Sequence, residues 1–210
     1  MIRRFRVSNF RCLENVELEF SRDFNLIFGA NASGKTSLLE ALAYLGRGKS
    51  FRGASTANLV RHGEAEFVLF GETEGETRSQ KLGVRNSKDG LEVRVDGSGD
   101  GGVAALADAL PLQVIDPEVH NLVAGGPELR RRFLDGVAFH VEHDHLEAWR
   151  RFRRALKQRN AALKARAAAA AIRSWNAEFT ELGEALDQSR RRALEVAIDS
   201  LSEYGQGLLG

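Results

Sequence analysis

The first half of the chain alternates short apolar runs with polar or glycine-containing turns. Short runs rich in β-branched and aromatic side chains, bounded by such turns, are typical of strands. The tripeptide Lys88-Asp89-Gly90 separates two of these runs, as the turn of a hairpin does, so we expect an antiparallel arrangement in the middle of the chain. The predicted strands are residues 2–7, 16–20, 24–28, 67–70, 81–85, 91–95 and 112–115.

The apolar spacing becomes helical in two other parts of the chain. Residues 37–45 carry leucines and alanines at the spacing of one helix face, and glycines follow directly. Beyond Pro127 apolar residues return every three or four positions, which predicts two or three long helices. The alanine run at 167–171 favours a helix or the neighbourhood of a helical hairpin turn. We therefore expect an α/β lobe at 1–126 and a helical lobe at 127–210.

Composition narrows the class of protein. Over 210 residues, 43% hydrophobic and 28% charged residues with a net charge of +1 are typical of a folded globular protein and argue against disorder, collagen or a disulfide scaffold. Cys12 is the single cysteine, which suits a reducing compartment. The chain has neither the apolar core of a secretory signal nor an apolar run of membrane-spanning length, so we expect a cytoplasmic protein without a membrane anchor.

One motif carries recognisable chemistry. An octapeptide between the predicted strand at 24–28 and the predicted helix fits G-x-x-x-x-G-K-[ST], the phosphate-binding loop or Walker A motif. Its backbone amides and the helix dipole would hold phosphates, while the lysine would reach the β- and γ-phosphates and the threonine hydroxyl would bind Mg²⁺. The alternative is an ordinary glycine-rich turn. The predicted ATP-binding residues are Gly29, Ala30, Asn31, Ala32, Ser33, Gly34, Lys35 and Thr36.

The acidic partner that hydrolysis needs has no good candidate. A Walker B motif is an apolar strand that ends in an acid, and residues 112–116 come nearest to it. Gln113 interrupts this run, and a polar residue in a buried central strand needs a partner of its own. We therefore do not assign residues 112–116 as Walker B.

Basic residues are concentrated in one stretch. Residues 150–173 hold nine lysines and arginines and no acid, enough to neutralise several DNA phosphates without reading bases. The alternative is a solvated helix face that pairs with the acids that follow it, namely Glu178, Glu181, Glu184 and Asp187. The candidate DNA contacts are Arg130, Arg131, Arg150, Arg151, Arg154 and Lys157.

A histidine-rich segment offers a weaker possibility of metal binding. It contains His140, His143 and His145, with Glu142 and Asp144 between them. One helix cannot direct all of these side chains at one ion, and no cysteine lies nearby to complete a site. We therefore do not predict a metal site there.

Several sequence blocks in the same order resemble the RecF family of bacterial recombination proteins. The resemblance covers the whole chain and is more specific than Walker A alone. The blocks are residues 5–11, 29–42, 48–52, 116–118, 126–127, 130–135 and 156–163.

The resemblance implies an α/β P-loop ATPase head of the ABC/SMC type, with an antiparallel β subdomain and a helical lobe. It implies ATP and Mg²⁺ as cofactors, ATP-dependent homodimerisation, binding to single- and double-stranded DNA and junctions, and cooperation with RecO and RecR in loading RecA. It also implies that Arg11 lies near the nucleotide base or sugar, and that Gln113 stands near the metal. The alternatives are a solvated Arg11 at the end of an edge strand and a buried Gln113 that bonds to backbone.

Such proteins also carry an S-x-G-Q signature motif and a Walker B strand after the helical region. This sequence reaches Gly210 without either, so we expect an incomplete head, either an N-terminal portion of a longer protein or a truncated reading frame. Whether the chain alone is an ATPase stays open. Two rival hypotheses are a stand-alone P-loop kinase or NTPase that acts on a small molecule, and a non-catalytic interaction fragment.

Overall fold

The computed structural model describes residues 1–53, 55–75, 78–142 and 144–209. The chain divides into two compact units, Met1–Ile115 and Asp116–Gly210, which are described separately. The division expected at residue 126 falls within the second unit, in the two-residue connection between α3 (Asn121–Ala124) and α4 (Pro127–Val141).

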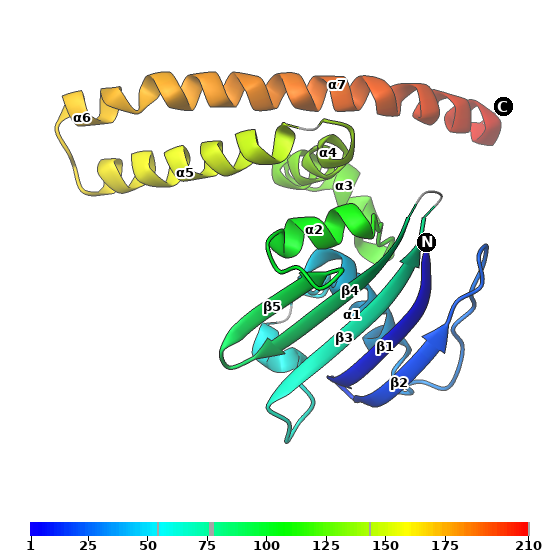
Figure 1. Ribbon diagram of the computed structural model, residues 1–210. Coiled ribbons are helices and arrows are strands. Elements are labelled where there is room, and N and C mark those ends of the chain that lie inside the picture. The colour runs from blue at the N-terminus through cyan, green and yellow to red at the C-terminus, as the bar shows by residue number, and fades with distance from the viewer. Residues whose placement is uncertain (54, 76–77, 143, 210) are drawn as a thin grey trace. The chain divides into compact units, whose positions relative to one another are not determined.

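A five-stranded antiparallel sheet of order β2-β1-β3-β4-β5 forms the body of the first unit (Figure 1). In its register Phe5 lies opposite Leu18 on one side and Gly71 on the other. Five of the predicted strands and the antiparallel hairpin around residues 88–90 are confirmed. The strands are β1 (Ile2–Phe10), β2 (Leu13–Glu19), β3 (Glu66–Glu74), β4 (Ser79–Ser87) and β5 (Gly90–Val95).

Two helices pack on one face of this sheet, and the core lies between them and the strands. They are α1 (Lys35–Arg47), the predicted helix, and α2 (Gly102–Ala109), which the sequence did not predict. Alternate residues of the strands point inward, as expected of a sheet with one covered face. Phe10, Tyr44 and Phe67 form an aromatic cluster in which ring centroids lie 5.0–6.2 Å apart.

The other face of the sheet carries ion pairs between neighbouring strands. Glu17 pairs with both Arg4 and Arg6, and Arg85 pairs with Glu66 at 2.7 Å. These pairs hold the pKa of Glu17 below its ordinary value, chiefly through the hydrogen bond from Arg4. The pairs are exposed to solvent and add little to the stability of the fold.

Two of the predicted strands are wrong. Residues 24–28 and 112–115 are not paired with any described strand, although each is as apolar as β1. Phe24, Leu26 and Phe28 are 70–84% exposed, and Ile115 is 79% exposed. A strand needs a neighbour to satisfy its backbone groups, so an apolar run is not sufficient to form one.

The second unit is helical, as predicted. The longest helices, α5 (His145–Lys164) and α7 (Asn176–Leu209), lie side by side and run in opposite directions (Figure 1). Phe152 stacks on Phe179 at 5.0 Å, and leucines at 182 and 186 are buried. The short helix α6 (Ala169–Ser174) stands at the turn, which confirms the expectation for the alanine run.

A buried polar cluster joins α4, α5 and α7. The His145 Nδ1 atom lies 2.8 Å from the hydroxyl of Ser189, and its Nε2 atom lies 3.5 Å from an oxygen of Asp135. Arg190 donates two hydrogen bonds to the same Asp135 carboxylate, at 2.7 and 3.1 Å. Ser189 is only 4% exposed, and the cluster ties the three helices together.

In the part of the chain that the structure describes, no helix combines the length and apolar character that crossing a bilayer requires.

Candidate functional site

The octapeptide at 29–36 forms a curled loop that leads into α1. Three of its residues have positive φ, namely Gly29 at 151°, Ala32 at 63° and Gly34 at 93°. Left-handed backbone of this kind turns successive amides toward one side, as a phosphate-binding loop requires. The helix then begins at Lys35, as the motif predicts.

Gly34 is needed for both its conformation and its size. A Cβ atom on Gly34 would lie 3.1 Å from the side chain of Leu13 and 3.3 Å from the sulfur of Cys12. The turn between β1 and β2 therefore packs directly against the end of the loop. Cys12 also contacts Ser37 in the first turn of α1, at 3.5 Å from sulfur to oxygen.

Positive charge and free amides gather where α1 begins. The Lys35 ammonium crosses the loop and donates to the carbonyl oxygens of Gly29 and Ala30, at 2.9 and 2.7 Å. No side chain caps the N-terminus of α1, and the first turn contains no acid. Thr36 is exposed in that turn. Uncapped amides, the helix dipole and one lysine make a site for an anion, and the threonine hydroxyl is a hard oxygen ligand for a cation bound to that anion.

Arg11 lies beside this loop and is not a solvated side chain. Its guanidinium donates from Nε and Nη2 to the two oxygens of Glu40, at 3.1 and 3.0 Å. Glu40 is fully buried in α1 and also accepts a hydrogen bond from Ser50 at 2.5 Å, and Arg52 lies 4.0 Å from it. The alternative of a solvated arginine at a strand end is therefore wrong.

Glu40, Ser50 and Arg52 were not among the site residues predicted from the sequence. One signal was available, because Glu40 is an acid within the apolar pattern of residues 38–45. A charged residue at such a position is buried only when it is paired.

Gln113 is exposed, and its amide lies 3.3 Å from the neighbouring carbonyl of Val114. The alternative of a glutamine bonded to backbone is thus confirmed for the hydrogen bond, but its expectation of a buried side chain is wrong. The acid that follows, Asp116, accepts a hydrogen bond from the amide of Glu118 and begins a short 3-10 helix, Pro117–His120.

The predicted DNA contacts on α5 are largely without acidic partners. Among the described residues, only Arg151 pairs with an acid of the following segment, at 3.8 Å from Glu178. In the described part of the chain Arg150, Arg154 and Lys157 are exposed and have no ion-pair partner. Their spacing of four and three places them on one face of the helix. We call Arg150, Arg154 and Lys157 the α5 stripe.

The two candidates on α4 differ from each other. Arg130 donates to carbonyl oxygens at the end of α3, most closely to Gly125 at 2.9 Å, so its guanidinium is used within the fold. Arg131 is exposed without a charged partner among the described residues.

The histidine-rich segment does not gather ligands in the described residues. No group of three metal-ligating side chains converges there. His145 is instead buried against Ser189, and His143 lies outside the described residues.

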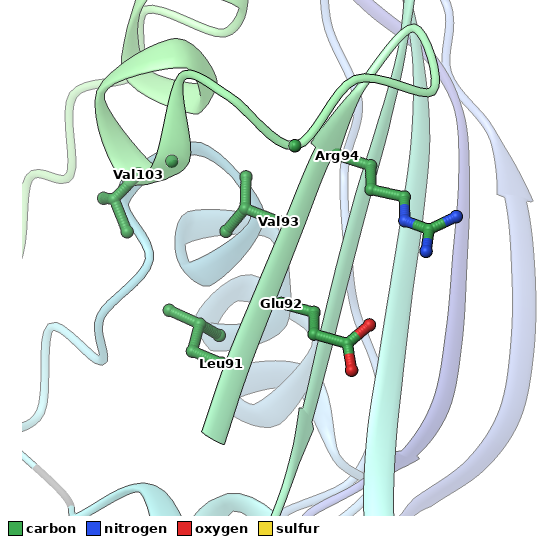
Figure 2. Close-up of a pocket in the computed structure, with 7 residues that line it drawn as sticks. Leu91, Glu92, Val93, Arg94 and Val103 are labelled. Carbon is green, nitrogen blue, oxygen red and sulfur yellow. The ribbon is translucent and has the colours of Figure 1, made fainter. Parts of the chain in front are cut away.

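A shallow hollow of about 370 Å³ lies between β5 and the start of α2. Figure 2 shows Leu91, Val93 and Val103 on one side of the strand, while Glu92 and Arg94 point to its other side. The charged side chains therefore do not converge in this hollow, and it offers no arrangement for catalysis.

Comparison with known proteins gives the family. A profile described as an AAA domain matches residues 4–110, about half of the chain, including the whole loop. The chain belongs to this AAA domain family.

Curated relatives that match nearly the whole chain are RecF proteins, which confirms the resemblance found in the sequence. The DNA replication and repair protein RecF of Klebsiella pneumoniae is 39% identical over 98% of this chain and 58% of the relative. That of Salmonella arizonae is 42% identical over the same shares. The chain thus spans somewhat more than half the length of the curated relatives that it matches.

Solved structures agree with the sequences. A structure of the recombination mediator protein RecF with ATP, from the RecFOR pathway, superposes with a TM-score of 0.88 at 26% identity, over 96% of this chain and 56% of that one. An SMC head domain from Pyrococcus furiosus shares the fold, with a TM-score of 0.54 at 17% identity, over 96% of this chain and 61% of that one. The predicted ABC/SMC-type head is confirmed as the fold class.

Proposed function

We propose that this chain is the nucleotide-binding part of a RecF-type DNA replication and repair protein, which binds ATP with Mg²⁺ and uses it to control dimerisation on DNA. The observation that carries the proposal is the loop at 29–36. Its left-handed backbone leads into an uncapped helix, and Lys35 lies across it. A RecF protein that was solved with ATP has the same fold.

The residues of the loop fit Mg²⁺-ATP. The amides at the start of α1 and the Lys35 ammonium would hold the β- and γ-phosphates, and the exposed Thr36 hydroxyl would bind Mg²⁺. Arg11 is proposed beside the base or sugar on the resemblance, and the packing of Cys12 and Leu13 on Gly34 and of Cys12 on Ser37 supports a place next to the loop. Gln113 is proposed near the metal on the resemblance alone.

DNA is the proposed partner of the helical unit. The α5 stripe presents three exposed cations without acidic partners among the described residues, which suits the repeating phosphates of a nucleic-acid backbone. Arg131 and Arg151 are further candidates, while Arg130 is the weakest because its donors already bond to carbonyl oxygens. Single- and double-stranded DNA and junctions are the expected forms. RecO, RecR and, indirectly, RecA are the expected protein partners, in the cytoplasm.

A stand-alone kinase or NTPase acting on a small molecule is not favoured, because the similar proteins are RecF proteins over nearly the whole chain. The two hypotheses differ in a direct test. Mg²⁺-ATP should promote dimerisation and DNA binding under the first, whereas the monomer should transfer phosphate to a metabolite under the second.

The test of the proposal is nucleotide binding by a pair of matched variants. Calorimetric titration with Mg²⁺-ATP should show that Lys35→Ala weakens binding about tenfold to a hundredfold, since a charge-assisted contact to phosphate is lost. Lys88→Ala removes the same charge from the exposed hairpin turn and should leave binding unchanged. Equal affinities of the wild type and Lys35→Ala would contradict the proposal.

A further inference from the structure

The cluster around Glu40 connects three parts of the first unit at the nucleotide loop. Arg11 comes from the turn after β1, Glu40 from α1, and Ser50 with Arg52 from the segment after α1. All of them converge on one carboxylate whose side chain is fully buried. A charged group out of contact with water is tolerated only when it is paired and hydrogen-bonded, and here both oxygens of Glu40 have partners.

The cluster fixes the orientation of Arg11. Its backbone has a φ of 55°, a left-handed conformation that costs energy for a residue with a side chain, and its amide donates to the carbonyl of Leu59 at 2.7 Å. With Nε and Nη2 both bonded to Glu40, the planar guanidinium cannot rotate without losing two hydrogen bonds. Its side chain is 24% exposed, so part of the group still reaches solvent.

Among the described residues, the remaining N–H donors of Arg11 have no hydrogen-bond partner and can therefore meet a ligand. A guanidinium carries five N–H donors, and the two contacts with Glu40 use only part of them. Two arginines face one carboxylate, so the cluster keeps one uncompensated positive charge at the side of the loop where Cys12 and Leu13 pack on Gly34. A cation that is held in place before the ligand arrives loses less conformational entropy on binding.

We propose that Glu40 is a positioning residue for nucleotide binding, which holds Arg11 against the loop and joins it to the segment at Ser50 and Arg52. This inference rests on the proposed function, because it assigns Glu40 a role at the same nucleotide site. Glu40 does not touch the nucleotide in this role. It acts through Arg11, so its effect on affinity must depend on Arg11 being present.

The experiment is a double-mutant cycle on Mg²⁺-ATP affinity, measured by calorimetry on the full chain. Glu40→Gln keeps the size of the side chain and removes its charge, and it should weaken binding about tenfold, as loss of a residue that orients a ligating group does. In the Arg11→Ala background the same substitution should change affinity less than about twofold, because the group that Glu40 orients is gone. Glu17→Gln breaks an arginine–glutamate pair on the open face of the same sheet and should leave affinity unchanged.

Thermal unfolding of each variant separates positioning from folding. A merely structural Glu40 would lower the melting temperature with unchanged affinity in the folded protein, or would weaken binding equally with and without Arg11, and either result overturns the inference. If Glu40→Gln does not fold, Ser50→Ala removes one hydrogen bond to the same carboxylate and should weaken binding a few-fold, again only when Arg11 is present.

The Lys35→Ala variant separates a failure of the proposed nucleotide site from a failure of the positioning role of Glu40. If the wild type binds Mg²⁺-ATP no better than Lys35→Ala does, the proposed function fails. If Lys35→Ala weakens binding and Glu40→Gln does not, the nucleotide site stands and the role of Glu40 is refuted.

Discussion

The cations at the loop and the cations of the α5 stripe differ in how the fold holds them. At the loop, Lys35 bonds to two carbonyl oxygens and Arg11 is fixed by the buried Glu40. On α5, Arg150, Arg154 and Lys157 extend into solvent without acidic partners among the described residues. Groups held by hydrogen bonds suit a compact ligand with one geometry, whereas exposed charges without acidic partners suit a long polyanion whose phosphates can be met in many registers. The contrast supports a small anion at the first region and nucleic acid at the second.

The largest effect is expected from releasing the held arginines. Glu40→Ala removes the hydrogen bonds that Arg11 and Ser50 make to a charged group and leaves a cavity at a fully buried position, so it should lower the free energy of unfolding by about 3–5 kcal/mol. Urea denaturation measures the change. Glu17→Ala breaks an exposed pair and should cost no more than about 1 kcal/mol. Equal costs for the two variants would show that burial of the pair does not matter.

In the helical unit, Arg190 is held by the carboxylate of Asp135, and the stability of this pair should depend on pH. Burial raises the pKa of Asp135, but the nearby His145 and the bidentate Arg190 lower it more, so its pKa lies below the ordinary value in the folded state. The folded protein then binds fewer protons than the unfolded chain. The stabilisation is therefore present above the unfolded pKa of about 4 and is lost as the pH falls below it, toward the folded value.

Asp135→Asn checks this expectation. The substitution should cost about 1.5–3 kcal/mol at neutral pH, because a charge-assisted pair is lost, and the cost should shrink as the pH falls below about 4, toward the lowered pKa of the folded carboxyl. Urea midpoints followed by circular dichroism from pH 7 downward measure this trend. Asp187→Asn, in an exposed pair with Arg191, is the matched control and should show a much flatter dependence. A cost for Asp135→Asn that does not vary with pH would refute the assignment.

Removing the α5 stripe should change the salt dependence of DNA binding. Each phosphate contact that is lost lowers the slope of log affinity against log salt by about 0.9, so Ala at Arg150, Arg154 and Lys157 together should lower it by about 2.7. Fluorescence anisotropy with duplex DNA at several salt concentrations measures the slope. The control replaces Arg132, Arg191 and Arg192 by Ala, which removes the same charge from residues already paired with acids. Equal slope changes in both triple variants would indicate a general charge effect.

The smallest effect concerns the backbone of the loop. Ala32 has a φ of 63°, which is costly for alanine and free for glycine, so Ala32→Gly should raise the melting temperature slightly, by the equivalent of at most about 1 kcal/mol. Ala30 has no positive φ, so Ala30→Gly should lower stability instead. Differential scanning calorimetry compares the two, and a loss of stability in Ala32→Gly would show that the left-handed backbone there is not under strain.

Much of the first unit was predictable because its signals are local. The apolar residues alternate along the strands because one face of the sheet is covered, and those of residues 37–45 have helical spacing because one face of α1 is buried. The structure shows both patterns. The loop was predictable because glycine, lysine and threonine are needed at fixed positions. The expected strands at 24–28 and 112–115 failed because strand formation depends on a neighbour that an apolar pattern does not reveal.

The cluster around Glu40 beside the loop was harder to predict from the sequence. Arg11 is 29 residues from Glu40, and the packing of the β1–β2 turn on α1 brings them together, whereas Ser50 is 10 residues from Glu40 and reaches it from the segment that follows α1. The resemblance to RecF placed Arg11 near the nucleotide but gave no reason to expect Glu40 as its ion-pair partner. Likewise, the acidic residues after the basic stretch were plausible partners for it, but within the part of the chain that the structure describes only Glu178 pairs with an α5 arginine.

The most direct test of the nucleotide site is to follow the backbone amides of the loop by NMR during titration with Mg²⁺-ATP. The account predicts that the amide signals of Gly34, Lys35 and Thr36 shift with increasing Mg²⁺-ATP, that adenosine without phosphates does not shift them, and that Lys35→Ala reduces the response. Signals of these three amides that stay in place while the nucleotide binds elsewhere, or does not bind, would contradict it.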